Sequence, residues 1–184
     1  MTGIASKAQL RMSFLRYALF TVPGVLLLGT LSGTLANAGY DNVWFLALRK
    51  PGLMPPGWVF ALGWPILYVL LGLSLAMLLH ARGAKGRDRV LALFCLGLVL
   101  NFAWPPIFFA WHKVDMALSI LAGMVVVTFV LIALIWRIRP VAAVLLIPYL
   151  LWLMGAVALN FQIVGLNPGA ENLVPGATVI DIPG

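Results

Sequence analysis

The sequence predicts an all-α membrane protein, a five transmembrane helix bundle, and three observations support that prediction. Of the 184 residues, 63% are hydrophobic and only 9% are charged, whereas soluble domains carry about 25% charged residues. The mean hydropathy is +1.06. Continuous apolar runs approach or exceed the roughly 20 residues with which a helix crosses a bilayer, and none alternates as a strand does. These five runs cover residues 15–37, 57–80, 90–111, 115–136 and 141–164.

The first run also has the outline of a signal peptide. Basic residues precede it, and Ala36-Asn37-Ala38 resembles a cleavage site. However, the apolar stretch 17–35 is longer than a usual signal core, and its glycines suit a packed membrane helix because small residues let helices approach closely. We therefore favour a retained helix, preceded by a short cytoplasmic N-terminal segment, residues 1–14.

Lysine and arginine are distributed unevenly between the two sides of the helices. Because cytoplasmic loops are enriched in these residues, we predict a cytoplasmic N-terminus and an external C-terminus. The net charge of +7 then reflects topology and contact with membrane lipid, and we expect no nucleic-acid partner, since no basic face is evident. Nine basic residues lie on the N-terminal side (Lys7, Arg11, Arg16, Arg82, Lys85, Arg87, Arg89, Arg137, Arg139) and three on the other (Arg49, Lys50, Lys113).

The stretch Trp44–Tyr68 connects the first two helices and enters the second. It holds three of the seven tryptophans, and Lys50, Pro51, Pro55 and Pro56 interrupt its beginning. An aromatic, proline-rich loop that leads directly into a membrane helix suggests a lid over a pocket within the membrane. By the predicted topology this loop is external.

Aromatic and amide side chains of three helices should gather beneath this loop, in the outer half of the bundle. Residues three or four positions apart lie on one face of a helix. Tryptophans near helix ends are typical of the interfacial belt, which is the interpretation we favour for Trp58, Trp111 and Trp136. The predicted stripes are Phe60, Trp64 and Tyr68; Asn101 and Trp104; and Trp152, Ala156 and Asn160.

Asn101 and Asn160 are polar groups within apolar helices. An unpaired buried amide costs roughly 1–3 kcal/mol, so each requires a partner. That partner is either another helix or a ligand, and the two interpretations are compatible. Four prolines inside the apolar runs should kink the helices, because each removes a backbone donor: Pro65, Pro105, Pro106 and Pro148.

Several kinds of chemistry find no support in the residues. No ionisable group lies deep in an apolar run, which argues against an ion pump. His80 and His112 are predicted at opposite ends of the bundle, so they cannot hold one haem together. The single cysteine, Cys95, allows no disulfide within the chain. We expect no metal site and no required cofactor, and no nucleophile–base pair or phosphate loop is present.

Three motifs resemble one known family. They are W-x3-L-x-KP-x3-PP-x-WVF-x3-W-x2-LY at Trp44–Tyr68, N-x2-WPPIFF at Asn101–Phe109, and PY-x2-W-x7-N at Pro148–Asn160. Together they resemble the TspO/MBR family, also called the translocator protein, tryptophan-rich sensory protein or peripheral-type benzodiazepine receptor family. The resemblance covers residues 15–167, which form the five-helix domain, and leaves 168–184 as a flexible C-terminal tail.

The resemblance implies a homodimer with a ligand pocket beneath the first long loop. Its ligands include protoporphyrin IX and related tetrapyrroles, sterols and synthetic isoquinoline carboxamides. Trp64 and Trp152 match a pair linked to light-dependent porphyrin breakdown, and Ala156 matches a ligand-affinity polymorphism. The positions that match the family's pocket are Trp44, Trp58, Phe60, Trp64, Asn101, Trp104, Trp152, Ala156 and Asn160.

Some residues depart from the family pattern. Phe45 stands where tyrosine is frequent and Leu53 where tryptophan is frequent, so the lid is less aromatic. The sterol-recognition pattern is absent, because Phe161 is followed by no basic residue. Gly97 and Asn101 offer a small-residue face for the expected dimer.

The function we expect is a porphyrin-binding protein of the bacterial cell membrane that senses, carries or disposes of tetrapyrroles. Planar ligands would stack on the aromatic faces, and Arg49 or Lys50 at the mouth would pair with a porphyrin propionate or contact lipid headgroups. One alternative is a light-dependent porphyrin-degrading enzyme that uses Trp64 and Trp152. Another is a sterol- or lipid-binding or purely structural membrane protein.

Overall fold

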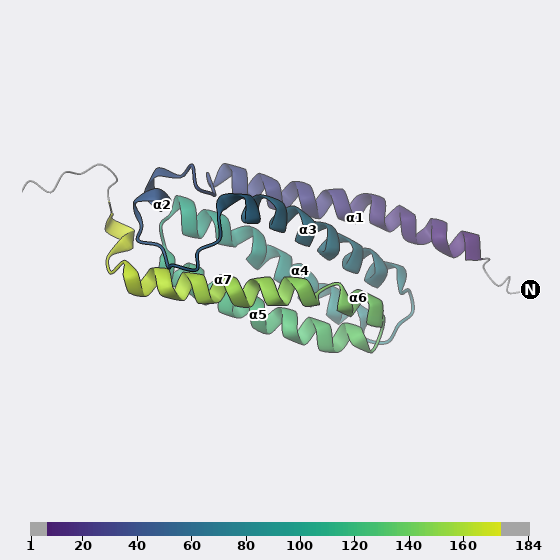
Figure 1. Cartoon of the computed structure of the whole chain (residues 1–184). Helices are drawn as coiled ribbons and strands as arrows, with labels where there is room; N and C mark the ends of the chain where they lie inside the picture. The colour runs from purple at the N-terminus through teal and green to yellow at the C-terminus, as the bar shows by residue number, and fades with distance from the viewer. Residues whose placement is uncertain (1–6, 174–184) are drawn as a thin grey trace, which may run out of the picture.

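The computed structural model describes residues 7–173 as an elongated bundle of helices (Figure 1). Five segments are long and apolar enough to cross a membrane: Met12–Leu35, Gly57–His80, Arg87–Ala110, Val114–Trp136 and Pro140–Leu166. The predicted five-helix architecture is thereby confirmed, and the chain is an integral membrane protein. The elements are α1 (Lys7–Leu35), α2 (Val43–Ala47), α3 (Gly57–His80), α4 (Arg87–Pro105), the π-helix η1 (Pro106–Ala110), α5 (Val114–Trp136), α6 (Pro140–Val144), α7 (Ile147–Leu166) and the 3-10 helix η2 (Ala170–Asn172).

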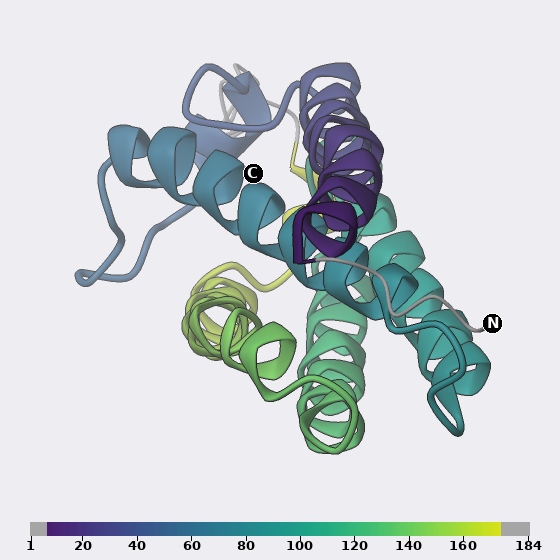
Figure 2. The same cartoon turned by 90° about the vertical axis from the view of Figure 1, so that its right-hand side faces the viewer.

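The two ends of the bundle differ in what they carry. The short helices α2 and η2 lie at one end, which we call the lid end (Figure 1). The start of α1, the α3–α4 connection and α6 lie at the opposite end, which we call the basic end, because the arginines of the α3–α4 and α5–α6 connections lie there. Figure 2 views the bundle from the basic end.

Helices α1 and α3 pack closely through small residues. A Cβ added at Gly72 of α3 would lie 2.6 Å from the Cα atom of Val22 in α1. The Thr21 hydroxyl donates a hydrogen bond to the Gly72 carbonyl at 2.8 Å, and Gly29 lies directly against the Tyr68 ring. Such close contacts between helices replace the hydrophobic driving force that a bilayer lacks.

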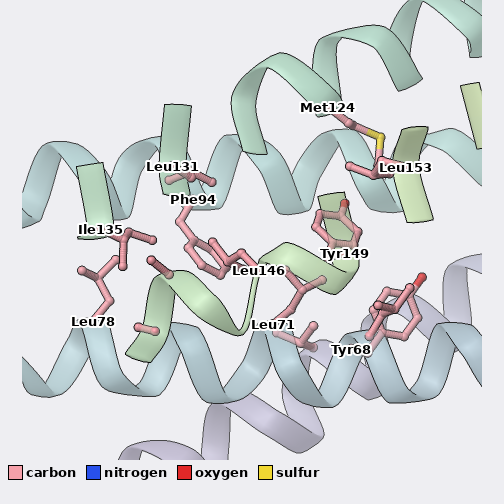
Figure 3. Packing of buried hydrophobic residues seen from close by; sticks show 14 of the residues in the cluster. Tyr68, Leu71, Leu78, Phe94, Met124, Leu131, Ile135, Leu146, Tyr149 and Leu153 are labelled. Atoms are coloured by element: carbon pink, nitrogen blue, oxygen red, sulfur yellow. The ribbon is translucent and has the colours of Figure 1, made fainter. Parts of the chain in front are cut away.

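The main core lies where α3, α4, α5, α6 and α7 meet. Helix α5 packs against α4 on one side and against α6 and α7 on the other. The buried Ser74 hydroxyl of α3 donates to the Ala142 carbonyl of α6 at 2.9 Å, which satisfies its polar atom at the contact between these two helices. Figure 3 shows the apolar side chains that fill this core, among them Phe94, Leu146 and Leu153.

Prolines divide two of the predicted continuous helices. The third span passes from α4 into the π-helix η1 at Pro105-Pro106, since neither proline has an N–H to continue the regular ladder. The fifth span is broken between Val144 and Ile147, and Pro148 lies in the first turn of α7. By contrast, Pro23 and Pro65 lie inside unbroken helices.

The small-residue face expected for dimer contact points into the bundle instead. A Cβ added at Gly97 would contact Val127 at 3.4 Å and Leu131 at 3.8 Å, both in α5. Asn101 is 2% exposed and bonds to Tyr149 of α7. That expectation was therefore wrong, because both residues serve the internal packing of α4.

Candidate functional site

An aromatic cluster joins α3 to α7 in the half of the bundle nearest the lid end. The rings of Phe60 and Trp152 meet edge to face with centroids 5.8 Å apart, and those of Trp64 and Trp152 do so at 5.9 Å. The ring centroids of Trp64 and Tyr68 are 5.6 Å apart. We call these four residues the α3–α7 aromatic cluster. A Cβ at Gly63 would overlap the Trp152 ring, so glycine at this position lets the indole lie against the α3 backbone.

Three side chains in the same half of the bundle have buried polar atoms without partners. The Asn101 amide donates to the Tyr149 hydroxyl at 2.8 Å, but its oxygen accepts nothing. The indole N–H of Trp104 and both polar atoms of the Asn160 amide also lack partners. Each unpaired buried group costs roughly 1–3 kcal/mol. All of these unpaired atoms belong to residues that the sequence predicts to contact ligand. Unpaired buried polar atoms call for an explanation, and a functional site is one.

The lid comprises residues 40–56 and is held by its own polar side chains. The Asn42 side chain caps α2, accepting from the Phe45 N–H at 2.9 Å, and donates to the Phe109 carbonyl at 3.3 Å. The Tyr40 hydroxyl donates to the Pro55 carbonyl at 2.6 Å. These bonds fold the loop back on itself and fix it to η1.

Trp44 fastens the lid to the rest of the protein. Its ring stacks on His112 with centroids 4.2 Å apart and meets Phe108 edge to face at 5.5 Å. Its indole N–H donates to the Ala170 carbonyl at 3.0 Å. Burial lowers the pKa of His112, an effect partly offset by a hydrogen bond to the Phe109 backbone.

The residues after α7 bind the lid. The Asn167 amide bonds both the N–H and the carbonyl of Arg49, at 2.7 and 2.8 Å, and the Lys113 ammonium pairs with Glu171 at 2.5 Å. We call residues 167–172 the latch. The segment expected to be a flexible tail thus begins with a docked turn, and the remainder, 174–184, lies outside the described residues.

The two basic residues of the lid behave differently. The Lys50 ammonium donates to the carbonyls of Phe45, Leu46 and Leu48 at 2.7, 3.2 and 3.3 Å and lies 4.7 Å from the Phe45 ring centroid. Desolvation lowers the pKa of Lys50. Lys50 therefore caps the C-terminus of α2, where a cation is favourable. Arg49 uses its backbone for the latch and has an exposed side chain.

The predicted pocket residues lie in different parts of the structure. Phe60, Trp64 and Trp152 touch one another, whereas Trp44 belongs to the lid and Trp58 is 65% exposed. Trp104 connects the groups, because it stacks on Phe108 at 5.1 Å while also packing against the main core. Asn101 and Asn160 are buried, and Ala156 is half-buried against the core.

Sequence reasoning missed three residues of this region. Tyr149, the partner of Asn101, lies in the quoted PY motif, and the need to pair a buried amide could have indicated it. Asn167 precedes a proline, which signals the end of a helix but not a bond to the lid. His112 has φ of 58° and stacks on Trp44, which no local pattern indicates. Within residues 7–173, His, Cys, Asp and Glu form no group able to hold a metal ion.

Comparison with known proteins shows which family this chain is similar to. The sequence model of the TspO/MBR family matches residues 21–166. A translocator protein from Ovis aries is 36% identical over 152 residues, covering 78% of this chain and 86% of its own length. Protein CrtK of Rhodobacter capsulatus is 31% identical over 134 residues, covering 71% and 82% respectively. A tryptophan-rich sensory protein of Cereibacter sphaeroides is 32% identical over 124 residues, covering 67% and 77%.

Proposed function

Because the chain belongs to the TspO/MBR family, we propose that it binds a porphyrin, such as protoporphyrin IX, between α3, α4 and α7 beneath the lid, and that it senses, carries or disposes of tetrapyrroles. One observation carries the proposal. Orphaned polar atoms of Asn101, Trp104 and Asn160 occur in the same half of the bundle as the aromatic cluster, and a tetrapyrrole offers both a flat face and ring nitrogens.

Stacking and polar contact would contribute separately to binding. Each well-placed aromatic pair adds about 0.5–1.5 kcal/mol beyond area burial, and Trp64 and Trp152 supply indole faces on opposite helices. Their rings lie edge to face, so a planar ligand must part them to enter. Arg49 is a better candidate than Lys50 to pair with a propionate, because the Arg49 side chain is exposed and the Lys50 ammonium is already bound to three carbonyls.

A fluorescence titration tests the proposal. Protoporphyrin IX added to the detergent-solubilised protein should quench tryptophan emission saturably. In Trp152→Leu the quenching should weaken and the midpoint should rise, whereas Trp136→Leu, which removes a 52% exposed indole at the basic end, should keep the wild-type midpoint. Absence of saturable quenching, or equal midpoints for the two variants, would favour a structural or lipid-binding role.

A second candidate function is light-dependent degradation of the bound porphyrin, with dioxygen as oxidant. It is favoured by the direct contact between Trp64 and Trp152 and by the adjacent Tyr68 ring, since these three oxidisable rings belong to the proposed site. The binding proposal does not depend on it.

We further propose the setting in which this binding takes place. The chain would lie in a bacterial cell membrane as a homodimer, with the basic end cytoplasmic and the lid end outside. The orientation is supported by the distribution of basic residues, of which nine flank the basic end and three the lid end, in accordance with the positive-inside rule. A cysteine introduced at exposed Leu53 in the lid should react with an impermeant maleimide in intact cells if this orientation is right.

A further inference from the structure

A hollow lies at the basic end of the bundle, opposite the lid end. Its volume is about 340 Å³. That volume falls at the lower end of the range for small-molecule sites, roughly 300–1,000 Å³. Three elements form its wall, seen from their ends in Figure 2: α1, the end of α3, and α6 with the residue before it. The lining residues are Phe14, Met77, His80, Arg139, Pro140 and Val141.

The hollow combines an apolar wall with a basic rim. Phe14, Met77 and Val141 supply hydrocarbon surface, and the Phe14 ring meets the His80 ring edge to face with centroids 6.4 Å apart. In the described part of the chain, the Arg139 guanidinium forms no ion pair, and the ion pairs that occur join Arg87 to Asp88 and Lys113 to Glu171. Arg139 is therefore a cation that lines a largely apolar hollow and has no ion-pair partner among the described residues.

Few acidic side chains could neutralise this region. Asp88 lies in the first turn of α4, at the basic end. Its carboxylate oxygen lies 3.0 Å from a guanidinium nitrogen of Arg87. The described basic residues here include Arg82, whose guanidinium is engaged with the Tyr17 hydroxyl. Arg139 is the arginine among the residues that line the hollow. A guanidinium binds phosphate with two parallel hydrogen bonds, so an anionic oxygen group fits this position.

We propose that this hollow is a binding site for one anionic phospholipid, with an acyl chain along Phe14, Met77 and Val141 and the phosphate against Arg139. Two features favour a lipid over a soluble anion. The wall is predominantly apolar, which a free anion does not need. The lining side chains also lie within the predicted membrane spans or at their ends. Lipid phosphates lie at the membrane surface, near the ends of such spans.

Native mass spectrometry of the full chain in detergent tests the proposal with dioleoyl phosphatidylglycerol and dioleoyl phosphatidylcholine as probes. One phosphatidylglycerol should be retained in preference to phosphatidylcholine. Arg139→Gln should weaken its binding about tenfold, as expected for loss of a charge-assisted hydrogen bond. Met77→Trp, which fills the cavity, should abolish it. The matched control is Arg137→Gln, an exposed arginine two residues away that does not line the hollow.

Several results would overturn the site. Equal retention of the two lipids would show that the site does not distinguish an anionic from a zwitterionic phospholipid. Equal losses in Arg139→Gln and Arg137→Gln would indicate diffuse attraction of the basic end to lipid. Displacement of the bound lipid by millimolar inorganic phosphate would mean that the anion alone is recognised. Because protoporphyrin titration of the same variants reports on the lid end, failure here leaves the proposed function intact, and the reverse also holds.

Discussion

The side-chain amide of Asn167 pairs with the backbone of Arg49 as a neighbouring strand would. Its oxygen accepts from the Arg49 N–H at 2.7 Å, and its nitrogen donates to the Arg49 carbonyl at 2.8 Å. A third bond links the Asn167 nitrogen to Ile163 within α7. The end of the fifth span thereby fixes the position of the lid, and exchange of any ligand beneath the lid should depend on this pair.

Asn167→Ala should loosen the lid without unfolding the bundle. Each neutral hydrogen bond contributes about 1 kcal/mol net, and the site is partly exposed, so we expect protoporphyrin IX to dissociate roughly three to ten times faster. Stopped-flow recovery of tryptophan emission measures this rate. Asn172→Ala, in the exposed end of the latch, is the control, and equal rates in the two variants would exclude a latch role for Asn167.

Gly63→Ala should disturb the aromatic cluster. An added Cβ would overlap the Trp152 ring, so the indole must move or α3 and α7 must separate. We expect a lower melting temperature and weaker porphyrin binding. Gly155→Ala provides the matched control in α7, since nothing lies within 4 Å of its added Cβ, and alanine there gains up to about 1 kcal/mol of helix propensity. Equal thermal shifts in both variants would contradict the packing described for Trp152.

Asn160→Leu should raise the stability of the protein and lower its affinity for porphyrin. It removes two orphaned polar atoms, so the ligand-free protein should become more stable, by roughly 1–3 kcal/mol at most, while porphyrin affinity falls. Asn101→Leu should instead destabilise, because it deprives the buried Tyr149 hydroxyl of its partner. Thermal unfolding in detergent and fluorescence titration give the two readouts. A less stable Asn160→Leu protein would mean that this amide has a structural partner.

Light should be required for any porphyrin breakdown. The double variant Trp64→Phe/Trp152→Phe keeps two aromatic faces but raises the cost of oxidising the rings, so product formation should stop while binding persists within a fewfold. Absorbance spectra of protoporphyrin IX, recorded under illumination and in darkness with air present, measure the product. Turnover in the dark, or undiminished turnover in the double variant, would remove this candidate function.

Acidification should weaken the attachment of the lid through His112. Burial holds the folded-state pKa of His112 below its ordinary value of 6.5, so the unfolded form takes up the proton first as the pH falls. The stabilising contribution is therefore present above about pH 6.5 and is lost as the pH falls through the folded-state pKa. His112→Asn, which tolerates the positive φ, should flatten the difference in melting temperature between pH 7.5 and pH 5.5. An unchanged difference would place the pH response elsewhere.

The five spans could be predicted because length and hydropathy alone decide which segments cross a bilayer. The proximity of Phe60, Trp64 and Tyr68 followed from the helical repeat, and the structure places Trp64 and Tyr68 in contact. Their role toward a ligand remains a prediction, as do those of Trp58, Ala156 and Asn160.

The remainder depended on contacts between distant residues. Lys50 could have faced lipid, a ligand or backbone, and only the path of the lid decides that it caps α2. Whether a proline breaks a helix also depends on its neighbours: Pro65 lies within α3, whereas Pro148 begins α7. The expectation for Gly97 failed because small residues serve contacts within a chain as readily as contacts between chains.

The latch also sets an order of assembly during synthesis. Asn167 follows Arg49 by 118 residues, and Ala170 follows Trp44 by 126. Once η1 has been made, the lid can dock on Phe109 and His112. Its bonds to the latch can form only when α7 has inserted and residues 167–170 have emerged. Complete closure of the lid therefore depends on integration of the last span.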